Sequence, residues 1–198
     1  MKTIIISQPK SGTYLCSNVL KNLGINQTYL HIAENKSQQY DGSDLKNCVC
    51  NPRQYDILKP ISEILKLIND NDFCASHLEP IQSNINVTKN FKKIILTRNS
   101  IEDADKSWRA WLKYSGRTMS NSRGRRCAVN WKEHSKTWLK EKDTFHLTFE
   151  DMINKDTKKI DALQMFLFNE TRFDSLSVIE KSLREPSMTK SKNRENYT

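Results

Sequence analysis

The 198-residue chain has no long hydrophobic run. The apolar residues after Lys2 are interrupted by Gln8-Pro9-Lys10, so this segment is too short for the core of a signal peptide or for a membrane span. We therefore expect a soluble, cytoplasmic protein with no membrane partner. The content of hydrophobic residues, 36%, is enough for one core. We expect a single domain over residues 1–185.

Cysteine is present, but not in the pattern of a disulfide framework or a metal site. The five cysteines are an odd number without regular spacing, and Cys48-Val49-Cys50 lacks the two-residue gap of a zinc-binding pair. Reduced thiols in a cytosolic protein are the simplest account. The four histidines stand far apart in the sequence: His31, His77, His134 and His146. We expect no metal.

Acidic residues are outnumbered by basic ones, 23 to 32, which gives a net charge of +9. An anionic partner is therefore expected: nucleic acid, an acidic membrane surface or a small multiply charged ligand. One basic cluster is the stretch Lys113–Arg126, and another is the C-terminal tail, 186–198. The tail has little to bury, so we expect it to be mobile unless a ligand or partner orders it.

The chain does contain alternating strand and helix patterns. Apolar or β-branched stretches predict strands, and apolar residues at helical spacing predict helices between them. The predicted strands are Thr3–Ser7, Asp72–Ser76, Lys92–Thr97 and Thr144–Phe149. The predicted helices are Thr13–Leu23, Ile57–Ile68, Ile101–Tyr114, one around Val129–Leu139, and Ile160–Phe168. No element is assigned to the polar region Asn35–Asn51, and Ser115–Arg126 is interpreted as a loop.

Strands separated by helices predict an α/β fold with a mainly parallel central β-sheet flanked by helices. Ligands of such folds lie beyond the carboxyl ends of the strands. Three of the predicted strands end at candidate binding residues, namely the segment Pro9–Thr13, His77 and Arg98. We therefore expect the functional site at this edge of the sheet.

The loop after the first strand indicates an anion site. A glycine at a strand-to-helix turn lets backbone N–H groups approach a phosphate or sulfate ester, and Lys10 adds a positive charge. The loop is not the nucleoside-triphosphate motif G-x-x-x-x-G-K-[ST], because its lysine precedes its only glycine. No apolar strand ends in a convincing aspartate for Mg²⁺. These differences favour an adenine nucleotide bound without an obligatory metal.

Four segments resemble the cytosolic-type sulfotransferases, in the order of that family. Pro9–Thr13 resembles the P-K-S-G-T loop for the 5′-phosphosulfate, and Ser76–Pro80 (SHLEP) resembles the T-H-L-P element. Ile95–Trp108 resembles the strand-Arg-Asn-Pro…Ser element that binds the 3′-phosphate, and Leu147–Met152 resembles the Y-E-D-M/L segment. The resemblance covers Thr3 to about Phe168.

This resemblance implies a P-loop-like sulfotransferase architecture and transfer of a sulfuryl group from 3′-phosphoadenosine 5′-phosphosulfate (PAPS) to a hydroxyl or amine of a small-molecule acceptor, with PAP as the product. Lys10 and His77 would be catalytic: Lys10 stabilises the leaving group of an in-line transfer, and His77 takes the proton of the acceptor. The implied nucleotide-binding residues are Lys10, Ser11, Gly12, Thr13, Tyr14, Arg98, Lys106, Ser107 and Phe149.

The chain departs from the family pattern in three places. The serine that usually lies eight residues after the 3′-phosphate arginine is Lys106 here, with Ser107 one position later, so either side chain is a candidate for this contact. Tyr14 and Leu15 replace a threonine and a tryptophan of the loop. The C-terminal Arg-Lys-Gly element of the family is missing, and basic residues of the tail or of the loop before Cys127 are its candidate substitutes.

Other interpretations remain open from sequence alone. One alternative is a P-loop small-molecule kinase that depends on ATP and Mg²⁺, and another is a non-catalytic nucleotide- or RNA-binding protein on the same scaffold; nucleic acid is the less favoured partner. At the level of residues, His77 could be an ordinary polar residue at a strand end. Arg98 could pair with Glu102 or Asp103, and Phe149–Asp151 could cap a helix. The identity of the acceptor and the oligomeric state are not predicted.

Overall fold

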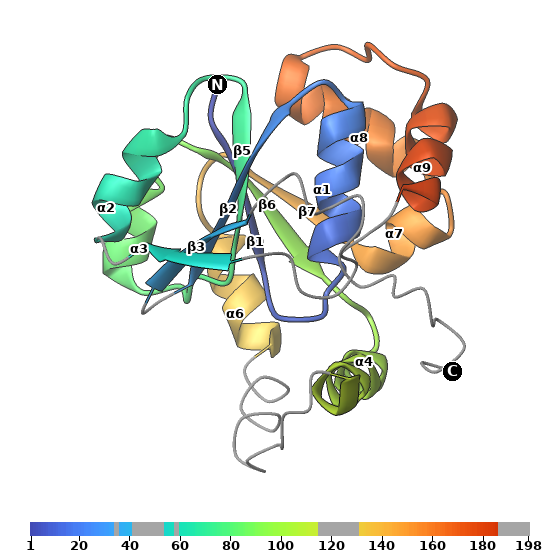
Figure 1. The fold of residues 1–198 in the computed structure, drawn as a ribbon. Helices are drawn as coiled ribbons and strands as arrows, with labels where there is room; N and C mark the ends of the chain where they lie inside the picture. Colours follow the sequence, from blue (N-terminus) through green and yellow to red (C-terminus); the bar gives the residue numbers. More distant parts are fainter. Residues whose placement is uncertain (34–35, 41–53, 58–59, 115–130, 186–198) are drawn as a thin grey trace.

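A central seven-stranded sheet organises the molecule (Figure 1). The computed structural model describes residues 1–33, 36–40, 54–57, 60–114 and 131–185. The strand order is β4-β3-β2-β5-β1-β6-β7. The strands are β1 (Thr3–Ser7), β2 (Asn26–Ala33), β3 (Lys36–Tyr40), β4 (Gln54–Ile57), β5 (Asp72–Ser76), β6 (Lys92–Thr97) and β7 (Thr144–Thr148). Five neighbours, from β2 to β7, run parallel, and β3 is antiparallel to both β2 and β4.

The strand β1 lies at the centre of the parallel part, between β5 and β6. All five of its residues are buried, as expected for a continuously apolar strand with both faces covered. Its register pairs Ile6 with Ser76 on one side and Ser7 with Leu96 on the other. The ends of β5, β1 and β6 therefore lie at one edge of the sheet.

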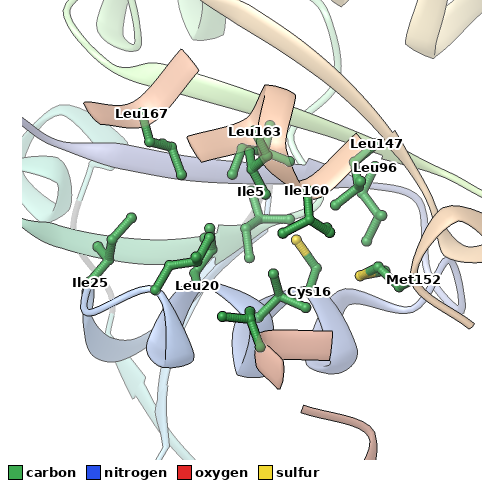
Figure 2. Packing of buried hydrophobic residues seen from close by; sticks show 14 of the residues in the cluster. Ile5, Cys16, Leu20, Ile25, Leu96, Leu147, Met152, Ile160, Leu163 and Leu167 are labelled. Carbon is green, nitrogen blue, oxygen red and sulfur yellow. The ribbon is translucent and has the colours of Figure 1, made fainter. Parts of the chain in front are cut away.

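One face of the sheet is covered by α1 (Thr13–Asn22), α7 (Phe149–Ile153), α8 (Thr157–Phe168) and α9 (Ser175–Arg184). Figure 2 shows how Ile5 of β1 and Leu96 of β6 pack here against Cys16 and Leu20 of α1 and Leu163 of α8. Burial of such side chains stabilises the domain by about 1.5–3 kcal/mol each.

The other face packs against α2 (Ile61–Ile64), a short 3₁₀ helix (Leu65–Leu67), α3 (Gln82–Val87) and α6 (Trp131–Trp138). The core on this face includes Ile4, Ile6, Ile64 and the fully buried Trp138. The helix α4 (Ile101–Tyr114) follows β6 and lies at the same end of the sheet as the loop after β1 (Figure 1). None of the helices in the described ranges is long and apolar enough to cross a membrane.

The predicted α/β fold with a mainly parallel sheet is confirmed, and so are the first three predicted strands. The fourth ends one residue early, because Phe149 begins α7. The helix predicted over Ile57–Ile68 is confirmed only in its second half: Ile57 ends β4, Pro60 has an extended backbone (ψ 143°), and helical residues run from Ile61 to Leu67.

The sequence analysis assigned no element to β2 or β3. In β2 (NQTYLHIA), strand-favouring residues such as Tyr29 and Ile32 are mixed with polar ones, whereas the composition of β3 carries little strand signal. The strand β3 has the sequence KSQQY, which contains no aliphatic residue. Its place in the sheet comes from pairing with its neighbours, β2 and β4. The loop Ser115–Arg126 and the tail 186–198 lie outside the described residues.

Candidate active site

Four loops meet at the carboxyl edge of the parallel strands. Lys10 follows β1, His77 directly follows β5, Arg98 directly follows β6, and Phe149 directly follows β7. These strands are neighbours in the sheet, in the order β5-β1-β6-β7. The residues that the sequence analysis selected from distant segments are therefore brought to one edge of the sheet.

The loop between β1 and α1 has a backbone that only a few residue types adopt readily. Gly12 has φ 93° and Lys10 has φ 69°, both in the left-handed region. The turn is closed by Ser11, whose Oγ donates to the carbonyl of Gln8 at 2.8 Å. This conformation leads the chain from the end of β1 directly into the first turn of α1.

The N-terminus of α1 is suited to an anion. Its first N–H···O bond runs from Cys16 to the carbonyl of Gly12 (3.1 Å), so the N–H groups of the preceding residues of the turn lie outside the helical ladder. Gly12 has no side chain that could cap them, and the first turn contains no acidic residue. The helix dipole adds partial positive charge at this point, which favours phosphate or sulfate.

Phe149 forms a wall behind this loop. A Cβ atom built on Gly12 would lie 2.4 Å from Cδ2 of Phe149, so only glycine fits this approach. The same ring supports Arg98, whose Cζ lies 4.5 Å from the ring centroid. Phe149 also begins α7, where Thr148 and Asp151 form a capping box. The segment therefore caps a helix, as the alternative interpretation expected, and also places Phe149 beside Gly12.

Arg98 is half-buried, and its guanidinium faces the β1–α1 loop. Its Nη1 donates to the carbonyl of Lys10 at 3.4 Å, whereas its buried Nε has no hydrogen-bond partner within the described residues. The alternative pairing with Asp103 is not observed: Asp103 instead contacts Lys106 at 3.5 Å. A buried guanidinium N–H without a partner is rare in proteins and fits a ligand that supplies an acceptor.

The helix α4 presents one side to the loop. The Nζ of Lys10 lies 6.0 Å from the ring centroid of Trp108, and Ala104, one helical turn earlier, is buried. Ser107 is half-buried and three residues from Ala104, so it shares this inward side. Lys106 is 76% exposed and points outward. Of the two candidates for the family's serine position, only Ser107 lies on the side that faces the loop.

His77 is held in a defined orientation by the central strands. Its Nδ1 lies 2.7 Å from the carbonyl oxygen of Ser7, and its backbone N–H donates to the carbonyl of Ile32 at 2.8 Å. A carbonyl oxygen only accepts, so Nδ1 carries the proton and Nε2 presents a lone pair. The Oγ of Ser7 also lies 3.4 Å from Nδ1 and 2.8 Å from the hydroxyl of Thr13.

The environment of His77 keeps its imidazole neutral. Burial lowers its pKa from 6.5 to about 4, with smaller lowering contributions from the charges of His134 and Lys10 and an opposing one from the bond to Ser7. At neutral pH the Nε2 lone pair is therefore available to accept a proton.

Two further histidines, which the sequence analysis did not select, lie around His77. The His31 and His77 ring centroids are 4.5 Å apart, and His134 Nε2 donates to the carbonyl of Leu78 at 2.9 Å. Trp138 Nε1 donates to the same carbonyl at 3.1 Å. The spacing of these residues in the sequence gives no signal of this, because the grouping depends on strand order. In the described ranges, no three His, Cys, Asp or Glu residues are arranged to hold a metal ion.

Comparison with known proteins gives a similarity at the level of structure. No protein-family model matches the sequence, and no curated protein matches it. Mouse sulfotransferase SULT7A1, solved in complex with PAP, aligns with a TM-score of 0.57 and 18% identity over 91% of this chain. A retinol dehydratase, solved with androsterone and the inactive cofactor PAP, aligns with a TM-score of 0.58 and 16% identity over 92% of this chain.

What the chain shares with these proteins is the fold. It spans 63% and 64% of their respective lengths. Their names, a sulfotransferase and a dehydratase, show that this fold occurs with more than one reaction. The activity of this chain therefore has to be argued from its own residues.

Proposed function

We propose that the chain is a PAPS-dependent sulfotransferase that transfers a sulfuryl group to a hydroxyl or amine of a small molecule and releases PAP. One observation carries the proposal: an anion-binding helix N-terminus with Lys10, a neutral His77 and a half-buried Arg98 meet at one edge of the sheet. The fold similarity to two proteins that were crystallised with PAP supports the identity of the nucleotide.

The β1–α1 loop fits the 5′-phosphosulfate end of PAPS. The N–H groups of the first turn of α1, including that of Tyr14, and the hydroxyl of Thr13 would donate to its oxygens, while Ser11 would keep the loop in shape through its bond to Gln8. Gly12 keeps this approach open because it carries no Cβ. Lys10 would offset the negative charge that develops on the leaving phosphate. The bound nucleotide supplies the activated sulfuryl group.

Arg98 fits the 3′-phosphate, the group that distinguishes PAPS from ATP. Its Nε lacks a partner in the described part of the chain, and Phe149 holds its guanidinium plane in place. A planar guanidinium binds a phosphate dianion through two parallel hydrogen bonds. Ser107, on the inward side of α4, is the candidate for a further contact, and Lys106 is the weaker one.

His77 is suited to be the general base. Its Nε2 would take the proton from the hydroxyl or amine of the acceptor as that atom attacks sulfur. The resulting imidazolium would keep its Nδ1–H bond to Ser7. A carbonyl acceptor stabilises the imidazolium more than the neutral ring, so the bond favours proton transfer. The negative charge of the bound nucleotide would also raise the pKa of His77 and so favour proton transfer to it.

A comparison of two nucleotides tests the proposal. In a thermal-shift assay PAP should raise the midpoint of unfolding more than ATP with Mg²⁺ at equal concentration, because only PAP fills a 3′-phosphate site. A preference for ATP–Mg²⁺ would instead support the kinase alternative. Incubation with labelled PAPS and a metabolite extract then identifies the compound that gains sulfate. PAP binding without any turnover would support the non-catalytic alternative.

A further inference from the structure

His31 lies beside His77 on the neighbouring strand, β2. Its side chain is 7% exposed, and its ring meets that of His77 at an interplanar angle of 63°, with the two centroids 4.5 Å apart. The proposed reaction assigns no role to this residue. A positive charge on His77 disfavours a positive charge on His31.

The strand register explains how the two rings meet. His31 pairs with Ala75 of β5, and His77 lies two residues beyond Ala75, on the same side of the strand. This register places the two histidines close enough for their rings to meet. The backbone is fixed at the same place, because the N–H of His77 donates to the carbonyl of Ile32.

We propose that His31 is a positioning residue: its ring is the wall that holds the His77 imidazole with Nδ1 on the carbonyl of Ser7 and Nε2 toward the acceptor. This inference rests on the proposed function only in giving His77 the role of base. The orientation itself is set by contacts on two sides, the bond to Ser7 on β1 and the ring of His31 on β2.

The charge of His77 also acts on His31. Burial, followed by the charge of His77, holds the pKa of His31 well below its usual value. The charged or titratable groups that lower the pKa of His77 are His134 from α6 and Lys10 from the loop after β1. When His77 takes the proton of the acceptor, its charge keeps His31 neutral, and the two rings meet edge to face.

Nuclear magnetic resonance of the free protein tests this role without any nucleotide. In protein with labelled histidines, we would measure the pKa and tautomer of His77 in the wild type, His31→Val and His31→Phe. Valine suits a strand but removes the wall, whereas phenylalanine restores an aromatic ring. We expect His31→Val to raise the pKa of His77 by about 1 unit or more toward 6.5, because water gains access to the ring. His31→Phe should leave it within about half a unit.

His146→Val is the matched control, because His146 also lies on a strand but bonds to Thr97 on the far side of β1. It should leave the His77 titration unchanged. An unaltered pKa and tautomer of His77 in His31→Val would overturn the proposal. If that variant fails to fold, the wild type still decides: through-space contacts between the ring protons of the two histidines are required, and their absence refutes the arrangement.

Kinetics then separates positioning from binding. We expect His31→Val to lower kcat by about 10- to 100-fold, because a displaced base loses alignment. The Kd for PAP should change less than about twofold, since no nucleotide contact is lost, and His31→Phe should recover most of the rate. Absence of PAP binding by the wild type would refute the proposed function. The role of His31 would still be tested by the pKa of His77 in the free wild type and in His31→Val.

Discussion

The buried, neutral His77 makes the stability of the protein depend on pH in a defined window. Its pKa is about 4 in the folded state, against 6.5 for an unperturbed histidine. Between these values the unfolded chain binds the proton more readily, so acidification favours unfolding. The stabilisation is complete above pH 6.5 and is lost as the pH falls toward 4. The two pKa values give a loss of about 2 kcal/mol between pH 7.5 and 5, approaching about 3 kcal/mol at pH 4.

The assay is urea unfolding of the wild type and of His77→Gln between pH 7.5 and 5. The variant differs from the wild type in stability at pH 7.5, but it lacks the imidazole that titrates. The difference in unfolding free energy between the two proteins should therefore change by about 2 kcal/mol over this range. Ser182→Ala, which removes a buried hydroxyl on α9, should run parallel to the wild type. Parallel curves for His77→Gln and the wild type would refute the idea that His77 is buried in its neutral form.

Four further outcomes are expected at the site. Lys10→Ala should lower the rate of sulfuryl transfer by about 10²- to 10³-fold with an unchanged circular dichroism spectrum; retained activity would remove Lys10 from the mechanism. Gly12→Ala should destabilise the fold by about 1–3 kcal/mol in urea unfolding, because its methyl group would clash with the ring behind the loop. Arg98→Ala should weaken PAP binding by about 10- to 100-fold in calorimetry but leave 5′-AMP binding unchanged. Ser107→Ala should weaken PAP binding more than its neighbour control, Lys106→Ala, and the reverse order would reassign the contact.

The parts of the site that sequence could predict are those encoded locally. The strand β1, the loop after it, and the ends of β5 and β6 are each marked by a short apolar run followed by a polar or charged residue. Parallel strands place such ends at one edge, so the meeting of Lys10, His77 and Arg98 could be inferred before any coordinates.

The surroundings of His77 could not be predicted, because they depend on which strands become neighbours. His31 lies on β2, to which the sequence analysis assigned no strand, and β2 joins the sheet next to β5. His134 lies on α6 and reaches this region because α6 packs on the sheet face opposite α1. Only the start of the helix predicted from Ile57 was wrong, because apolar spacing alone does not separate a strand end from a short helix that begins after a proline.

Ser7 gives the two halves of the site a common reference point. Its hydroxyl forms a hydrogen bond with the hydroxyl of Thr13 at the start of α1, and its carbonyl accepts a hydrogen bond from Nδ1–H of His77. One residue of the central strand therefore contacts both the loop proposed to bind phosphate and the proposed base. If the proposed function holds, loops elsewhere on this edge can change in sequence to admit new acceptors without moving His77 relative to the loop after β1.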